Sequence, residues 1–176
     1  MKPSIWTYYS ASLQLLLCFC QVHGLMYEVV IDSVEPDAQN DKRYITVDSI
    51  RITRKKRNNY VVNADFEMYQ NLGNDIPVRY DIYYAGSSHP FVSGKTNFCD
   101  FYNMDDKIIN AIRAASTMPP RGTCPFPKGK YTISGYQLHE QDLPPMLPKG
   151  SYLVVARVDS FEEKLIFGYS ILVTVT

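Results

Sequence analysis

The sequence predicts an all-β fold, a sandwich or cup of about eight antiparallel strands with one short helix. Two observations support this prediction. Apolar and polar residues alternate in many short runs, and Pro, Gly, Asn and Asp separate these runs. Alternation is typical of strands with one buried face, and frequent turn residues are typical of antiparallel sheets. Only one segment has the spacing of a helix.

The strand-like runs are of two kinds. Six of them carry regular polar residues, and two near the end are more apolar, so we expect those two to be buried on both faces. Alternation is clearest in the third and fourth runs, where Phe66, Tyr80 and Ile82 each lie on the apolar face. In order, the six runs cover residues 27–34, 44–53, 59–69, 77–85, 91–98 and 130–138, and the two apolar ones cover 151–158 and 164–176.

The helical spacing lies in residues 105–118, where Ile108 and Ile112 fall on one face. Asp105 is placed to cap the N-terminus of this helix, and Pro119 ends it. A helix of about three turns is short for stability on its own. We therefore expect its isoleucine face to pack on the sheets.

A five-residue phrase occurs twice, as PKGKY at 127–131 and as PKGSY at 148–152. Proline and glycine favour a turn, and the tyrosine begins an alternating run, so each copy is predicted to start a strand. The proline-rich stretch 143–148 between them cannot be regular helix or central strand. Its apolar residues Leu143, Met146 and Leu147 either cap the edge of the core or line the mouth of a cavity.

Residues 1–24 have the layout of a secretory signal peptide: Lys2, the apolar run 13–20 and a small-residue exit at Gly24. The alternative is a membrane anchor, which needs about 20 apolar residues. We expect cleavage after Gly24, which leaves one domain of residues 25–176. Removal of Lys2 leaves 17 basic and 18 acidic residues. A net charge this close to zero does not favour a nucleic-acid-binding protein.

The residues give little sign of catalysis or metal binding. After cleavage only Cys99 and Cys124 remain, and two cysteines in a secreted domain most simply form one disulfide. His89 and His139 lack metal-ligand partners at useful spacing, so we predict no metal, no cofactor and no enzymatic activity. The basic run 51–57 is either a solvated hairpin tip or a contact for heparin or an acidic membrane.

Several motifs together resemble a known family. CDFY at 99–102, CPFPKGKY at 124–131 and LPPMLPKGSY at 143–152 resemble a large insect family of secreted domains, which is similar to the ML lipid-recognition superfamily that includes the ganglioside activator protein. YEVVIDSVEPD at 27–37 and NADFEMYQNLGNDIPVRY at 63–80 look like the insect chemosensory protein B (CheB) branch. The resemblance spans nearly all of residues 26–176.

The resemblance implies an immunoglobulin-like β-cup whose two sheets hold a hydrophobic molecule, secretion, and a part in pheromone detection. Cys99 and Cys124 match the family's shared bridge, and the helix at 105–118 and the loop at 143–148 would flank the rim. The related lipid carriers have more disulfides than the single one possible here. The ligand cannot be inferred from them.

Two functions are therefore considered first. One is a secreted, non-enzymatic carrier of a lipid, cuticular hydrocarbon or pheromone. The other is a protein-interaction module or co-receptor that modulates a membrane receptor or ion channel. The carrier hypothesis predicts a pocket lined by Phe66, Tyr80, Ile82, Ile112, Met146, Leu147, Phe167 and Tyr169. An enzyme acting on a lipid, through Asp142 or His139, is the weakest hypothesis.

Overall fold

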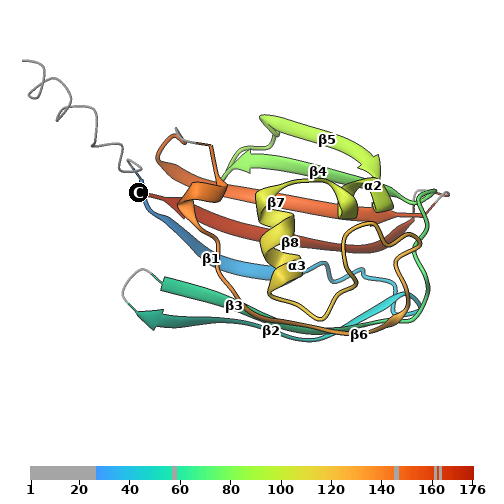
Figure 1. Ribbon diagram of the computed structural model, residues 1–176. Coiled ribbons are helices and arrows are strands. Elements are labelled where there is room, and N and C mark those ends of the chain that lie inside the picture. Colours follow the sequence, from blue (N-terminus) through green and yellow to red (C-terminus); the bar gives the residue numbers. More distant parts are fainter. Residues whose placement is uncertain (1–26, 57–58, 145–146, 161, 163) are drawn as a thin grey trace, which may run out of the picture.

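The computed structural model describes residues 27–56, 59–144, 147–160, 162 and 164–176 and confirms the all-β sandwich (Figure 1). Its described residues form eight strands in two antiparallel sheets. The strands are β1 (Val29–Pro36), β2 (Ile45–Lys56), β3 (Asn59–Met68), β4 (Pro77–Tyr84), β5 (Val92–Asn97), β6 (Gly129–Tyr136), β7 (Gly150–Asp159) and β8 (Leu165–Val175). Residues 1–24, the predicted signal peptide, lie outside the described part of the chain.

The larger sheet has the strand order β1-β8-β7-β4-β5, and the smaller sheet has the order β2-β3-β6. Figure 1 shows them as two layers, with α3 between them on the side that faces the viewer. Within the described residues, no helix has both the length and the apolar content needed to cross a membrane.

The alternation in the sequence decides which face of each strand is buried. In the larger sheet, Tyr80 lies opposite Ala156, which lies opposite Tyr169, so the three share one face. In the smaller sheet, Phe66 lies between Val47 and Tyr131. These faces are the inner ones, because their residues form the apolar clusters between the sheets.

The expectation that β7 and β8 are buried on both faces is wrong. Leu153, Val155 and Leu172 lie on the outer face of the larger sheet and are only half-buried, and Arg157 on that face is exposed. The helices of the described residues pack between the sheets or against their ends. None of these helices covers the outer face, whereas crossover helices cover both faces of a parallel sheet.

A helix lies within the predicted span 105–118, but it is shorter than expected, α3 (Lys107–Ala114). A second short helix that was not predicted, α2 (Phe98–Asn103), precedes it and is followed by an extended residue, Met104. Asp106, not Asp105, caps α3, because its carboxylate accepts hydrogen bonds from the N–H groups of Ile108 and Ile109 at 2.9 and 3.1 Å. The helix ends before the prolines.

The chain after α3 stops being helical because it bonds to the edge of the smaller sheet. The Thr117 N–H donates to the Thr132 carbonyl at 2.9 Å, and the Ser134 N–H donates to the Ala115 carbonyl at 2.7 Å. These bonds cover part of the β6 edge, which would otherwise expose unpaired backbone groups. They also hold α3 over the space between the sheets.

Both copies of the repeated phrase start a strand. Gly129 begins β6 and Gly150 begins β7, with φ angles of 158° and 147°. In each copy the tyrosine hydroxyl donates to the carbonyl of the proline four residues earlier. The Tyr131–Pro127 bond is 2.7 Å long and the Tyr152–Pro148 bond is 2.5 Å long. The repeat is therefore a turn closed by its own side chain.

Candidate ligand-binding site

The apolar residues between the two sheets differ in burial along the strands. At the end of the sandwich near the disulfide, which we call the closed end, ten of them form a fully buried cluster, among them Leu72, Val78 and Ile166. Leu72 is completely inaccessible, and Val78 and Ile166 are each 2% exposed. The closed end is an ordinary packed core. Its cluster is Ile45, Met68, Leu72, Val78, Phe98, Tyr102, Phe126, Tyr131, Val158 and Ile166.

Next to the closed end lies a group of half-buried apolar residues from both sheets, α3 and the adjoining loops, which we call the inner zone. Its fully buried members are only Ile31, Val62 and Tyr136. The residues that pack around these three come from both sheets and from α3, and all of them keep part of their surface accessible. They are Val34, Ile50, Ile52, Ile108, Ala111, Ile112, Ala115, Ile133, Leu138 and Ile171.

Helix α3 covers one side of the inner zone without being buried by it. Its apolar face, with Ile108 and Ile112, packs against this cluster, but none of its eight residues is fully buried. A helix of two turns gains most of its stability from packing. The Asp106 cap and the hydrogen bonds to β6 therefore have a large part in holding α3 in place.

The disulfide anchors the segment that carries α3 to the closed end. It joins Cys99 in α2 to Cys124, with the two Cα atoms 5.8 Å apart. Just beyond Cys124, Phe126 pairs with Leu72 through two backbone hydrogen bonds of 2.9 Å. Both ends of the segment are thus fixed, while its middle lies over the inner zone.

The predicted pocket residues lie along the whole length of the interior and do not form one compact group. Phe66 and Phe167 pack against the closed end, and Ile112 packs in the inner zone. Ile82 and Leu147 pack against a third cluster, of Tyr27, Tyr152 and Val175.

The other three predicted residues have different surroundings. Tyr169 lies on the inner face of β8, two residues before Ile171. The Tyr80 ring lies directly against Gly94 on β5, where a side chain on residue 94 would collide with it. Met146 lies outside the described residues.

Sequence reasoning missed Tyr136, the tyrosine buried in the inner zone. Burial raises the pKa of its hydroxyl, and the negative charges of Asp142 and Asp106 raise it further. Burial also raises the pKa of Tyr169. Tyr136 lies near the end of a strand-like run, three residues after Ile133, so strict alternation would place the two on opposite faces. A bulge in the pairing of β6 with β3 shifts the register between them. Alternation alone therefore could not predict that Tyr136 is inside.

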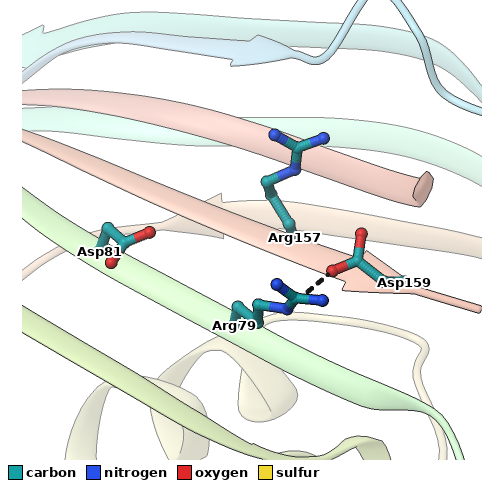
Figure 2. A pocket seen from close by; sticks show the side chains of 4 residues that line it. All are labelled: Arg79, Asp81, Arg157 and Asp159. Carbon is teal, nitrogen blue, oxygen red and sulfur yellow. Dashed lines mark ion pairs between the residues drawn. The ribbon is translucent and has the colours of Figure 1, made fainter. Parts of the chain in front are cut away.

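Two polar hollows lie outside the inner zone. One, of about 280 Å³, is on the outer face of the larger sheet and is lined by Arg79, Asp81, Arg157 and Asp159 (Figure 2). The buried carboxylate of Asp159 forms an ion pair there with Arg79, with 3.1 Å between Oδ2 and Nε. Charged walls of this kind do not suit an apolar chain.

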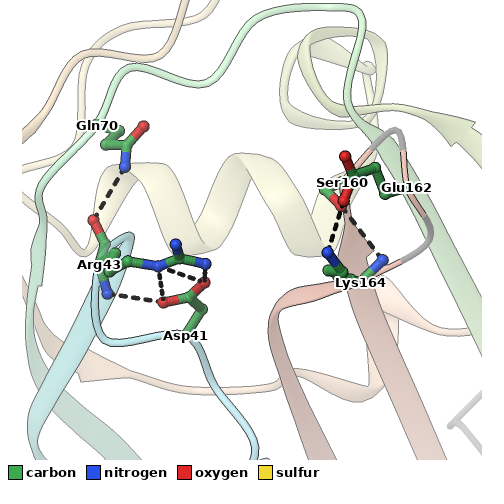
Figure 3. A network of polar contacts seen from close by, with 6 residues as sticks. All are labelled: Asp41, Arg43, Gln70, Ser160, Glu162 and Lys164. Carbon is green, nitrogen blue, oxygen red and sulfur yellow. Dashed lines mark hydrogen bonds and ion pairs between the residues drawn. The ribbon is translucent and has the colours of Figure 1, made fainter.

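The second hollow, of about 420 Å³, lies among the loops at the closed end (Figure 3). Four of the charged side chains that line it form two ion pairs. Arg43 donates to Asp41 at 2.6 Å, and these hydrogen bonds lower the pKa of Asp41 to about 2. Lys164 forms an ion pair with Glu162, also at 2.6 Å. Each of these two ion pairs lies within a single loop.

Two other sequence features are not drawn into the inner zone. In the basic run 51–57, the Arg54 guanidinium lies 5.9 Å from the centre of the Tyr60 ring, and residue 57 is outside the described part. A search of the described residues finds no group of three or more His, Cys, Asp or Glu side chains placed to hold a metal ion.

Part of the chain matches a known protein family. Residues 76–154 match the family described as "Protein of unknown function (DUF1091)". This region runs from β4 into β7 and includes α2, the disulfide and α3. No curated protein matches the chain.

Among solved structures, the chain is similar to chicken MD-1, which was crystallised in complex with lipid IVa. The identity is 12%, the TM-score is 0.37, and the match covers 86% of this chain and 98% of MD-1. At that TM-score we draw no conclusion from the likeness.

Proposed function

We propose that this protein is a non-enzymatic binding protein that holds a small hydrophobic ligand between its two sheets. The observation that carries the proposal is the inner zone. Apolar side chains on the inner faces of a sandwich are normally buried against one another. Here ten half-buried apolar side chains from the sheets, α3 and the adjoining loops surround only three buried ones, whereas at the closed end seven half-buried side chains surround ten buried ones.

A ligand would gain affinity from covering this surface. Each buried methylene contributes about 0.8 kcal/mol. An acyl chain that covered part of Ile50, Ile133 and Ile171 would therefore bind by the same effect that packs the closed end. Small-molecule sites are usually concave and mostly apolar, with few polar groups. The inner zone has this composition.

We further propose that the chain is secreted after cleavage behind Gly24, that residues 25–176 form one ML-like domain, and that it belongs to the CheB branch with a part in chemosensory or pheromone detection. The support is the signal-like layout of residues 1–24, the disulfide, and the motifs at 99–102, 124–131 and 143–152. The ligand class from this resemblance is a lipid, a cuticular hydrocarbon or a pheromone.

The test is native mass spectrometry of residues 25–176 secreted from insect cells, compared with an organic extract of the same sample. The proposal predicts a co-purified hydrophobic molecule, or uptake of one from an offered mixture of lipids and cuticular hydrocarbons. A protein of clean mass that takes up nothing from the mixture would show that the inner zone is merely a loose core.

One observation favours a second function, a protein-interaction module that acts on a membrane receptor or channel. The hairpin between β4 and β5 exposes three large apolar side chains, those of Tyr84, Phe91 and Val92, which are 45%, 46% and 40% exposed. The Tyr84 and Phe91 rings are stacked, with centroids 4.6 Å apart. Exposed aromatic groups are typical of protein interfaces. A Phe91→Ser variant that keeps ligand uptake but loses a receptor response would assign this hairpin to the second function.

A further inference from the structure

The outer face of the larger sheet carries a row of apolar side chains that no described helix covers. Leu153 on β7 lies opposite Tyr83 on β4 and opposite Leu172 on β8, and all three are half-buried. Val155 lies two residues further along β7 on the same face. The nearly continuous apolar sequence of β7 and β8 is typical of strands that are buried on both faces. A second surface packed on this face would bury them in that way.

On the β1 side of this apolar row, the outer face is acidic. The Thr174 hydroxyl on β8 donates to the Asp32 carboxylate at 2.6 Å. Glu35 lies on the same face and is exposed, and Asp37 lies beside Gly168. Neither β1 nor β8 contains a basic residue. This side of the face therefore carries three acids and no base.

On the β5 side, the same face is basic. Lys95 on β5 lies opposite Arg79 on β4, which lies opposite Arg157 on β7, so the three cations form one row across three strands. Asp81 and Asp159 lie among them, and Asp159 is the ion-pair partner of Arg79. Three bases against two acids leave a net positive charge. The outer face thus has an acidic side, an apolar centre and a basic side.

We propose that this face binds the same face of a second copy of the chain, in a dimer with twofold symmetry. Two sheets that pack face to face keep their strands roughly aligned. A twofold axis that runs along β7, the central strand, places the β1 side of each copy over the β5 side of the other. Acidic and basic sides then face each other twice, and the two apolar centres meet.

The strand register shows how well the two copies fit. Tyr83 of one copy lies over Leu172 of the other, and Leu153 lies over its own counterpart. Lys95 of one copy lies over the acidic side of the other, one row of the sheet away from Glu35. The same surface is therefore complementary to itself, which is the requirement for a twofold interface.

Arg157 lies near the proposed axis, and its position keeps it apart from its counterpart. Its stem passes over Gly168 on β8, where a side chain on residue 168 would crowd it. Its guanidinium points away from Arg79 (Figure 2). Each Arg157 thus leans toward the acidic side of its own copy, where Asp37 lies beside the same glycine. The two guanidinium groups diverge from the axis.

The area of the face is sufficient for a specific dimer. Five strands of about eight residues, spaced about 4.8 Å apart, present about 600 Å². Two such faces together bury about 1,200 Å², which is at the lower end of specific interfaces. The inner zone lies on the opposite face of this sheet. The inference therefore does not depend on the proposed function, and a dimer leaves the ligand site accessible.

Sedimentation velocity of the secreted protein, residues 25–176, over a dilution series in the micromolar range tests the proposal. We expect a dimer that dissociates on dilution. Leu153→Asp places a charge at the centre of the interface and should leave a monomer throughout the series.

An exchange of charges tests the arrangement of the two copies. Lys95 and Glu35 are exposed, and neither has an ion-pair partner within the described residues. Lys95→Glu and Glu35→Lys should each raise the dissociation constant of the dimer about tenfold, because each contact occurs twice. The double variant restores opposite charges and should return the constant toward that of the wild type. Arg51→Glu, an equal change of charge at an exposed position of the smaller sheet, is the matched control and should have no effect.

Three results would overturn the inference. The first is a wild-type protein that is monomeric at every concentration. The second is a dimer that Leu153→Asp leaves intact, because another surface would then form it. The third is a pair of weakened single variants that the charge exchange does not rescue. Circular dichroism checks the fold of each variant, and if Leu153→Asp is unfolded, the charge exchange at exposed positions decides the question.

Discussion

Two isoleucines on one strand allow the inner zone to be tested against the closed end. Ile166 and Ile171 both lie on β8, but Ile166 is 2% exposed in the closed end and Ile171 is half-buried in the inner zone. Replacement of each by alanine removes the same atoms. If the inner zone binds a ligand, Ile166→Ala should lose more stability than Ile171→Ala does. Ile171→Ala should lose more ligand affinity.

The expected magnitudes follow from burial. Ile→Ala deletes about three methylene equivalents, or about 2.4 kcal/mol of transfer free energy at full burial. At Ile166 the cavity left behind adds to this, so we expect a loss of about 3–4 kcal/mol in the free energy of unfolding. At Ile171 part of the side chain is already accessible, and we expect a loss of about 1 kcal/mol.

Ligand affinity should show the reverse order. A bound apolar ligand would cover the accessible part of Ile171. Ile171→Ala should therefore weaken the binding of the fluorescent apolar dye N-phenylnaphthylamine by about 1 kcal/mol, or about fivefold. Ile166→Ala should leave the affinity of the folded protein unchanged, because the closed end does not reach the ligand.

Urea denaturation gives the free energy of unfolding, and dye titration gives the affinity. The reasoning would be refuted if Ile171→Ala destabilised the protein as much as Ile166→Ala does and left dye binding unchanged. In that case the inner zone is ordinary core. The dye titrations are made without urea, at a temperature where both variants are folded.

Three further predictions concern the scaffold. Replacing Cys99 and Cys124 by alanine opens a loop of 25 residues and should lower the free energy of unfolding by about 3–4 kcal/mol, measured by urea denaturation; a loss near zero would mean that the segment is held by packing alone. Asp106→Ala removes the cap of α3 and should cost about 1 kcal/mol, with faster amide exchange confined to that helix. The pKa of Asp41 is lowered to about 2 by Arg43, so the stability that this carboxylate contributes is present above about pH 4 and is lost as the pH falls toward 2. Asp41→Asn should therefore be less stable than the wild type at pH 6 and equally stable near pH 2, and a difference that persists at pH 2 would contradict this.

The order and type of the strands could be predicted from the sequence, because alternation of apolar residues is a local property. Phe66, Tyr80 and Ile82 were placed on inner faces by this pattern alone, and the register of the sheets puts them there. The repeated Pro-Lys-Gly phrase likewise marked the starts of β6 and β7. Local turn chemistry is sufficient for both.

The helical segment was predicted less well, because its limits depend on distant partners. The helical spacing of apolar residues runs from Ile108 to Ala115 within the predicted span 105–118, but the backbone bonds between Thr117 and Thr132 end the helix early. The cap also moved by one residue, to Asp106, because Asp105 pairs with Asn110 and Arg121 instead. These partners are brought close by the fold.

The amino-acid sequence was enough to predict a sandwich of antiparallel strands with an apolar interior, because apolar and polar residues alternate with a period of two along most of the strands. Only the tertiary structure decided how completely each part of that interior is buried. Ile166 and Ile171 have the same side chain on the same strand, and their difference in burial comes from which residues of the other sheet and of α3 face them.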